Sequence, residues 1–420
     1  MVDYLKIAWR NLLRNKVRTF ISILAITVVV MIVVFSRGLI QGFTGSFSEE
    51  VINNTSGHVR VVNEEYRVRE VLRSLDYPVD GFHNQGLEHM IHNLETINLV
   101  EHILPRLQFG AMFSAAGDMH TILGVGIDSQ REEQQGTISG DITAGRMPDS
   151  GDEILVGRGL LEKMDGEVGG KVTLMYSDAF HSFRGRTFRI VGVRESGFTM
   201  IDNNLFYLPL ERAQYILDMD DQATEILIFG PTRAKAEELK NEITSLFDEF
   251  DQEDRYAVIH WLEADKFLAL MEEFDTIYDL MYLGFILLGA VILISTMNLI
   301  VRERKTEIGM MSALGLRGRD IMKIFTFEGV FMGLIGSFLG TIGGGMLNFY
   351  LSQEGIHVQA LAELVREMEF MFEPVFYPVY SLENLIYSFV MGIIVVTLAC
   401  LYPARKAGNM EPVDALQVDE

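Results

Sequence analysis

The chain has 420 residues, 49% of them hydrophobic, and a mean hydropathy of +0.19. These values indicate a membrane protein. The formal net charge is −23, and residues 38–280 account for all of it, with 20 Lys and Arg against 43 Asp and Glu. Such an acidic region excludes nucleic acid and anionic lipid as its partners. The single cysteine, Cys400, excludes an internal disulfide.

The N-terminal part of the chain predicts one membrane-spanning helix. Residues 1–18 carry five basic side chains and one acidic side chain, and 19–36 is uncharged over 18 residues. A signal peptide would have a shorter apolar stretch and a small-residue cleavage site, whereas Arg37-Gly38-Leu39-Ile40 follows here. We therefore predict an uncleaved span at 19–40, with 1–18 in the cytoplasm.

Residues 41–278 predict a folded α+β domain outside the membrane. Its pattern predicts strands at 58–62, 121–127, 153–156, 171–176, 187–193, 204–208, 225–229 and 256–260, and helices at 87–99, 210–217 and 233–247. A β-rich part at 111–195 separates two strand–helix parts, 41–110 and 196–262. Residues 262–279 have helical periodicity and predict a stalk that runs into the second span.

Three further spans follow, because each of the segments 280–301, 324–351 and 384–404 has an uncharged stretch able to cross about 30 Å. Basic residues gather in 302–323 and at the start of the tail 405–420, whereas 352–383 has one basic residue against six Glu. The distribution of basic residues places both termini and 302–323 in the cytoplasm, and 41–278 and 352–383 outside.

The rest of the chain is organised around 280–339, where two apolar helical runs flank a short basic segment. Short runs of small and apolar residues between charged residues favour a short helix at the inner membrane face, where a soluble partner can reach it. We predict that force enters the protein there. The residues assigned to this contact are Arg302, Glu303, Arg304, Glu307, Ile308, Gly309, Met311, Ala313, Leu314 and Gly315.

Two features of the third span leave alternatives open. Gly336, Gly340 and Gly344 lie on one helical face, which predicts either a dimer or intrasubunit packing seam or ordinary glycine tolerance in a membrane helix. Glu328 is either a functional charge inside the membrane or a residue at the interface where the helix starts.

No motif predicts catalysis. The chain lacks a G-x-x-x-x-G-K-[ST] loop, and Gly169-Gly170-Lys171-Val172 has neither the hydroxyl nor the spacing, so ATP hydrolysis by that mechanism is excluded. H-E-x-x-H and G-x-S-x-G are also absent. His89 and His92 are three residues apart on a predicted helix, where a solvated face is the interpretation we prefer to a metal site.

The segment Asp178–Arg186 predicts a hairpin loop with an apolar and locally basic tip. Phe180, His181, Phe183 and Arg184 are its candidate docking residues, within a domain that is otherwise acidic. The alternative is a hairpin whose phenylalanines fold back onto the domain.

Several local patterns match one known family, and together they cover nearly the whole chain. They are Ala8-Trp9-Arg10-Asn11-Leu12, Gly57-His58-Val59-Arg60-Val61 with Tyr66, Gly124–Asp128 (which lacks the family's proline), Arg302–Gly315, and Pro403–Ala407 with Pro412–Leu416. In these patterns the chain resembles the LolC/LolE-type permeases of lipoprotein-releasing ABC transporters, within the superfamily that includes MacB and FtsX.

The resemblance implies four transmembrane α-helices, an amphipathic N-terminal helix at 1–18, and a periplasmic α+β domain with a porter-like part and a β-rich insert. It implies an inner-membrane permease that is not itself an enzyme and needs no cofactor, because a separate ABC ATPase subunit binds ATP and Mg²⁺. The other partners implied are a second permease chain, as a homodimer or heterodimer, lipoprotein cargo, a periplasmic lipoprotein chaperone and membrane lipid, with no nucleic acid.

Lipoprotein extraction needs a sheltered apolar path, because acyl chains gain roughly 0.8 kcal/mol per CH₂ in the bilayer. The outer ends of the first two spans offer Phe35, Leu39, Ile40, Phe43, Met281, Tyr282 and Phe285, for which lipid-facing or packing roles are the alternative. In LolC-type subunits a hook on the β-rich part holds the chaperone, and Asp178–Arg186 lies where that hook would be, although it is short and lacks the hook's proline.

Three functional hypotheses remain after the sequence is read. The first is lipoprotein release. The second is a MacB-like exporter that transmits force to periplasmic substrates, and the third is an FtsX-like regulator that transports nothing and needs no apolar cavity. An enzyme in the exterior domain is a distant fourth, since no nucleophile or metal motif supports it.

Overall fold

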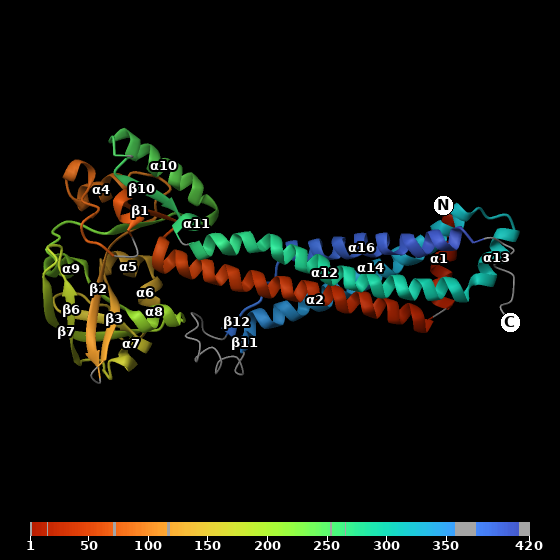
Figure 1. The fold of residues 1–420 in the computed structure, drawn as a ribbon, viewed down its shortest axis with the longest axis horizontal. Coiled ribbons are helices and arrows are strands. Elements are labelled where there is room, and N and C mark those ends of the chain that lie inside the picture. Colours follow the sequence, from red (N-terminus) through yellow and green to blue (C-terminus); the bar gives the residue numbers. More distant parts are fainter. Residues whose placement is uncertain are drawn as a thin grey trace. The chain divides into compact units, whose positions relative to one another are not determined.

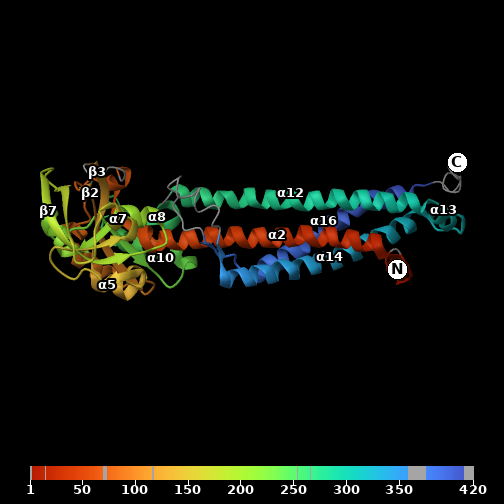
Figure 2. The same ribbon diagram turned by 90° about the horizontal axis from the view of Figure 1, so that it is seen from below.

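The structure is a computed structural model, and it describes residues 2–14, 16–69, 73–115, 118–252, 254–264, 266–357 and 375–410. The chain divides into two compact units. We call residues 1–45, 271–357 and 375–420 the helical unit, and residues 46–270 with 358–374 the α+β unit. Figures 1 and 2 show the long helices of the first and the sheet of the second.

The helical unit is built from long apolar helices. Its elements are α1 (Val2–Arg14), α2 (Lys16–Val51), α12 (Lys266–Glu303), α13 (Lys305–Ala313), α14 (Gly318–Glu354), α16 (Leu382–Gly408) and the short strands β11 (Ile356–His357) and β12 (Val375–Phe376). Among the described residues, four helices are long and apolar enough to cross a membrane: Lys16–Ser56, Ile277–Glu303, Gly318–Glu354 and Leu382–Gly408. The fold class predicted from the sequence is therefore confirmed.

One face of α14 packs its glycines directly against α2. A Cβ atom added to Gly336 would lie 2.7 Å from Cβ of Ile26, and one added to Gly340 would lie 2.6 Å from the carbonyl oxygen of Thr27. A Cβ atom added to Gly344 would likewise lie 2.7 Å from Cβ of Val34. The glycine spacing therefore forms an intrasubunit seam in which two backbones approach closely.

A second face of α14 packs against α16. Cβ atoms added to Gly329 and Gly333 would lie 2.2 Å from Sγ of Cys400 and 2.8 Å from Val396. Buried apolar side chains from α2, α12, α14 and α16 join in one core that includes Val30, Ile286 and Met332. Small residues on two faces thus let α14 pack closely against both α2 and α16.

The α+β unit carries the remaining elements. In chain order they are η1 (Ile52–Ser56), β1 (Val59–Asn63), α3 (Glu64–Val68), η3 (Phe82–Asn84), α4 (Leu87–Leu94), β2 (His102–Ala115), β3 (Asp118–Ile127), α5 (Ser129–Gln135), α6 (Thr137–Gly140), β4 (Ile142–Gly145), β5 (Glu153–Gly157), α7 (Arg158–Lys163), β6 (Lys171–Ser177), β7 (Phe183–Arg194), α8 (Thr199–Asn204), β8 (Leu205–Pro209), α9 (Leu210–Leu217), β9 (Glu225–Phe229), η4 (Arg233–Lys235), α10 (Ala236–Glu249), β10 (Tyr256–His260) and α11 (Trp261–Ala264).

Ten strands of this unit form one mixed sheet in the order β10-β1-β9-β2-β3-β8-β5-β7-β4, with β6 paired to β2 and β7. Strand β2 pairs with β9 over His102–Arg106 and with β6 at Ala111 and Met112. Two hydrophobic cores pack against the sheet. One lies beneath α4 and α10 around Ile91, Ile226 and Phe247, and the other lies against α7 and α9. The position 110/111, predicted to separate the two parts, lies inside β2.

The structure differs from the sequence expectation at several element ends. The predicted helix 87–99 ends at Leu94, and the predicted helix 233–247 is a 3-10 turn followed by α10. The hairpin loop is shorter than Asp178–Arg186, because Phe183 and Arg184 already pair with Ser177 and Tyr176. Most of the predicted stalk belongs to α12. The side chains of 265–276 lie outside the part of the chain that the structure describes, and so do residues 358–374 and the predicted motif Pro412–Leu416.

We expect the substitution Gly340→Leu to destabilise the helical unit by about 1–3 kcal/mol or more, because any side chain at this position meets the backbone of Thr27. Gly284→Leu on α12 is the matched control, since a Cβ atom there meets nothing within 4 Å. Thermal unfolding of both variants in detergent measures the difference. Equal melting temperatures would show that the seam is not tightly packed.

Candidate functional site

The centre of the candidate coupling site is a buried ion pair between Arg304, which precedes α13, and Glu328 on α14. Nη1 of Arg304 lies 3.1 Å from Oε1 of Glu328, and the two side chains are only 8% and 4% exposed. Nε of Arg304 also donates to Oε2 of Glu307, at 2.8 Å. Because each buried charge depends on its partner, the pair fixes the start of α13 against α14.

Helix α1 joins the same network from a third direction. Nδ2 of Asn11 donates to Oε1 of Glu328 at 2.6 Å, and Arg14 pairs with Glu307. Although partial burial opposes it, hydrogen bonds from Arg304 and Arg14 lower the pKa of Glu307 below its ordinary value. The carboxylate therefore stays charged at neutral pH, and its two ion pairs persist.

The predicted coupling residues divide into a buried base and an exposed tip. Ile308 and Gly309 are buried against the bundle, and Met311 packs on its core. The exposed members are Arg302, Glu303, Ala313, Leu314 and Gly315. Leu314 is 84% exposed, and Met310 beside it is 50% exposed, so the end of α13 presents apolar surface. Gly315 ends the helix with φ +93°, a conformation that glycine adopts without strain.

The predicted cavity residues lie on α2 and α12, toward the end of these helices away from α13. Tyr282 is buried in the core of the helical unit, and Ile40 and Phe285 pack against that core. Phe35, Leu39 and Phe43 are half-buried, and Met281 is 38% exposed. The structure brings these residues to one region, but several of them serve as packing residues in a single chain.

Arg37 connects three helices in this region. Its Nη1 lies 2.8 Å from Oδ1 of Asp279 on α12, and its Nε donates to Oδ1 of Asn384 on α16 at 2.9 Å. The guanidinium also lies over the rings of Tyr387 and Tyr282, at 4.0 and 5.6 Å. Sequence reasoning used Arg37 only as evidence against a signal-peptide cleavage site, although a lone charge beside an apolar run is the signal that could have identified its role.

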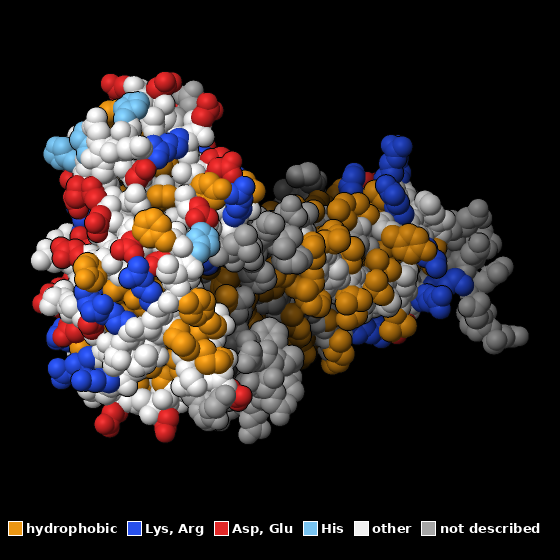
Figure 3. All heavy atoms as spheres, turned by 60° about the vertical axis from the view of Figure 1, so that its left-hand side comes forward, with side chains coloured by type: hydrophobic (Ala, Val, Ile, Leu, Met, Phe, Trp, Pro, Cys, Tyr) orange, Lys and Arg blue, Asp and Glu red, His pale blue; other side chains and the backbone are white. Residues whose placement is uncertain are grey.

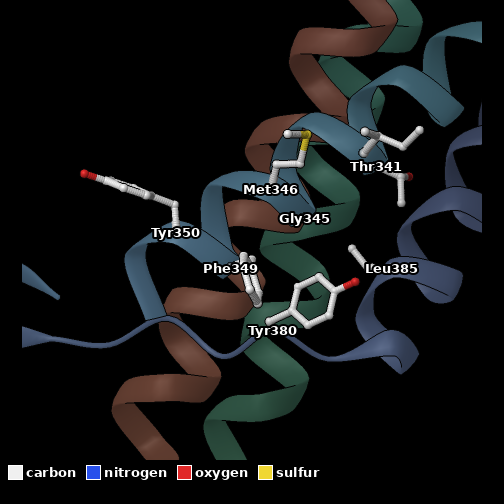
Figure 4. Close-up of a pocket in the computed structure, with 8 residues that line it drawn as sticks. Thr341, Gly345, Met346, Phe349, Tyr350, Tyr380 and Leu385 are labelled. Atoms are coloured by element: carbon white, nitrogen blue, oxygen red, sulfur yellow. The ribbon is translucent and has the colours of Figure 1, made fainter. Parts of the chain in front are cut away.

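An apolar groove of about 570 Å³ lies between α14 and α16 (Figure 4). Its lining residues are Thr341, Ile342, Gly345, Met346, Phe349, Tyr350, Tyr380 and Leu385. The rings of Phe349 and Tyr380 meet edge to face at 5.7 Å. None of these residues had been assigned to a functional site from the sequence, although Tyr380 was expected in an aromatic belt at the membrane interface.

The hairpin between β6 and β7 presents the predicted docking residues at its tip. Phe180 is 75% exposed and Phe183 is 68% exposed, so neither folds back onto the domain. The Asp178 carboxylate accepts hydrogen bonds from the backbone N–H groups of Ser182 and Phe180, and it pairs with Arg184. These bonds hold the pKa of Asp178 below its ordinary value of 3.8. His181 has φ +61°, which completes the tight turn.

A second buried polar centre lies within the α+β unit, where α2 ends in the π-helical turn η1. Arg106 donates to the backbone oxygen of Asn54, and Arg194 donates to the Asn54 side chain. Both guanidinium groups are buried and paired, Arg106 with Glu132 at 2.8 Å and Arg194 with Asp141 at 2.7 Å. The turn is therefore held by charge-assisted hydrogen bonds, a feature that sequence reasoning missed.

No metal centre is visible in the part of the chain that the structure describes, since no three His, Cys, Asp or Glu side chains gather closely enough. Several of the described titratable groups form buried ion pairs instead, such as Arg304 with Glu328 and Arg106 with Glu132.

We expect Arg304→Met to destabilise the protein by about 3–5 kcal/mol, because it leaves Glu328 charged and buried without its partner. The double variant R304M/E328M should recover part of that loss. Arg158→Met, which breaks an exposed pair with Glu195, should cost about 0–1 kcal/mol. Thermal unfolding in detergent compares the three, and a double variant no more stable than R304M would contradict a pairing role.

We expect Asp178→Asn to loosen the hairpin tip, because the amide accepts weaker hydrogen bonds from Phe180 and Ser182 and loses the ion pair with Arg184. Hydrogen exchange at 180–182 should become faster at neutral pH. In the native chain the depressed pKa keeps these bonds at neutral pH, and they are lost only as the pH falls through the lowered pKa. Glu162→Gln on α7 is the control, and unchanged exchange in D178N would contradict the interpretation.

Comparison with known proteins gives two family matches. Residues 19–246 match the MacB-like periplasmic core domain, and residues 280–412 match the FtsX-like permease C-terminal domain. The extracellular domain of the noncanonical ABC-type transporter YknZ from Gram-positive bacteria, a solved structure, aligns at 13% identity with a TM-score of 0.35, over 48% of this chain and 99% of that one.

Two curated relatives cover most of the chain. The lipoprotein-releasing system transmembrane protein LolC of Neisseria meningitidis serogroup B is 25% identical over 336 residues, which are 75% of this chain and 77% of that protein. The corresponding LolE protein of Haemophilus influenzae is 24% identical over 354 residues, 80% of each chain. The chain therefore belongs to the MacB/FtsX superfamily of ABC transporter permeases, and it is similar to LolC and LolE over most of its length.

Proposed function

We propose that this chain is the permease of a lipoprotein-releasing ABC transporter. A separate ATPase subunit hydrolyses ATP, and the permease uses the resulting movement to extract lipoproteins from the outer leaflet of the inner membrane and pass them to a periplasmic chaperone. The likeness to LolC and LolE over three quarters or more of the chain supports the choice of cargo. The observation that carries the mechanism is the buried Arg304–Glu328 pair, which ties α13 to the membrane helices.

The ATPase docks on the exposed end of α13 in this proposal. Met310 and Leu314 offer apolar contact at this end of α13, and the exposed charged residues Arg302 and Glu303 lie just before the helix in the chain. When the partner ATPases close, they push α13. Because Arg304 is bonded to both Glu307 and Glu328, the push moves α14 rather than bending α13 alone.

The movement then reaches the exterior domain through α2 and α12, which are each continuous in the chain from one unit into the next. At the end of α2, Asn54 is held by Arg106 and Arg194, so displacement of this turn displaces the sheet. This route requires both termini and α13 in the cytoplasm and the α+β unit in the periplasm, which agrees with the distribution of basic residues.

Cargo handling is assigned to the ends of α2 and α12 that carry Phe43 and Phe285. Extraction requires energy, because the free energy of transfer out of the bilayer is unfavourable by roughly 0.8 kcal/mol for each acyl CH₂ group. Half-buried aromatic and aliphatic side chains there offer an alternative apolar surface when two permease chains face each other, as a homodimer or a heterodimer. The exposed tip with Phe180 and Phe183 is the proposed contact for the chaperone.

We expect a photoreactive phenylalanine analogue at Phe43 or Phe285 to cross-link a triacylated lipoprotein in the assembled transporter. The matched control is Phe338 on α14, which is 56% exposed and lies outside the proposed path. Mass spectrometry of the products identifies the cargo, and a lipoprotein variant that lacks its acyl chains should not cross-link. Equal labelling at Phe43, Phe285 and Phe338 would contradict the assignment.

A MacB-like exporter is the second candidate, because residues 19–246 match the MacB-like periplasmic core domain. That function predicts an adaptor and an outer-membrane channel in the complex purified in mild detergent. Lipoprotein release predicts instead an ATPase subunit together with triacylated lipoprotein, so one purification distinguishes the two.

A further inference from the structure

We propose that α1 and the start of α2 form a binding surface for anionic phospholipid headgroups. The surface consists of Lys6, Arg10 and Lys16 with the apolar side chains of Trp9 and Leu13. The proposal does not depend on the identity of the cargo, because it concerns the membrane in which the permease lies.

The residues of α1 are sorted by their position around the helix. Ala8 and Leu12 are buried against the bundle, at 0% and 7% exposure. Trp9 and Leu13, one turn apart, are 46% and 56% exposed on an adjoining strip. Trp9 also meets Phe331 of α14 edge to face at 5.4 Å. Helix α1 therefore packs against the bundle and still leaves an apolar strip uncovered.

The next strip of the helix is basic. Lys6 and Arg10 are exposed, and Lys16 is exposed at the start of α2. Among the residues that the structure describes, none of the three has an acidic partner, whereas Arg14 and Arg18 pair with Glu307 and Glu303. Figure 3 shows basic side chains gathered at one end of the hydrophobic helical unit.

Unpaired like charges four residues apart destabilise a helix slightly. Lys6 and Arg10 have this spacing, so the two charges lie next to each other on one side of α1. A bound phosphate group removes that repulsion. The occupant must therefore be anionic.

The apolar strip beside the charges decides which anion fits. An acidic peptide or a free phosphate ion would leave Trp9 and Leu13 in water, while a phospholipid covers both strips at once, with its phosphate on the cations and its acyl chains on the apolar residues. A tryptophan beside basic residues is typical of a helix in the interfacial plane of a membrane. Anionic phospholipid is therefore the occupant to which we commit.

Trp9 itself provides the test. The chain has two tryptophans, so Trp261→Phe leaves Trp9 as the only one. The full-length variant is placed in phosphatidylcholine vesicles of two kinds. One kind contains equal fractions of phosphatidylglycerol and brominated phosphatidylcholine. The other contains equal fractions of brominated phosphatidylglycerol and unbrominated phosphatidylcholine. We expect the brominated anionic lipid to quench Trp9 more strongly. The triple variant K6Q/R10Q/K16Q should reduce that preference at least fivefold, which is the effect of about one surface charge.

The matched control is K171Q/R189Q/K235Q, which removes three exposed charges from the α+β unit and should keep the preference. Equal quenching of Trp9 by the two brominated lipids would overturn the proposal, as would a triple α1 variant that keeps the preference. If W261F does not fold, native mass spectrometry replaces fluorescence. The unmodified chain should then retain more phosphatidylglycerol than K6Q/R10Q/K16Q, and equal retention would overturn the proposal.

Discussion

The buried pair of Arg304 and Glu328 is the interaction on which the helical unit depends most. Both side chains are almost excluded from solvent, so neither can be lost without leaving an uncompensated charge. Through Asn11 and Glu307 the same pair also reaches α1 and α13. One ion pair thus determines where the short helix outside the membrane lies relative to the long helices within it.

The α+β unit applies the same physical rule at the turn that follows α2. Arg106 and Arg194 are buried, and each is neutralised by a carboxylate while it also bonds to Asn54. A hydrophobic contact would tolerate sliding, whereas hydrogen bonds from two fixed guanidinium groups do not. Buried charge pairs therefore fix both of these turns, the one before α13 and the one after α2.

Hydropathy and charge predicted the four long helices, and alternation predicted most strands, because these signals are local in sequence. Strand β2 was missed, since its residues, with Pro105 and Gly110 among them, do not alternate and are largely buried. The partners of Arg37, Arg304 and Arg194 lie up to 347 residues away, so no local pattern indicates them. Glu328 was noticed as a charge beside an apolar run, but its partner emerged only from the fold.

The glycine face of α14 has a consequence for assembly. Gly336, Gly340 and Gly344 are covered by α2 of the same chain, so the surface best suited to close helix contact is not available to another subunit. Under the proposed function, a second permease chain is then recognised through larger side chains, such as Leu288 and Val291 on α12, which are 65% and 60% exposed. Contacts of that kind slide and separate more readily than glycine contacts, which would suit subunits that part when cargo enters.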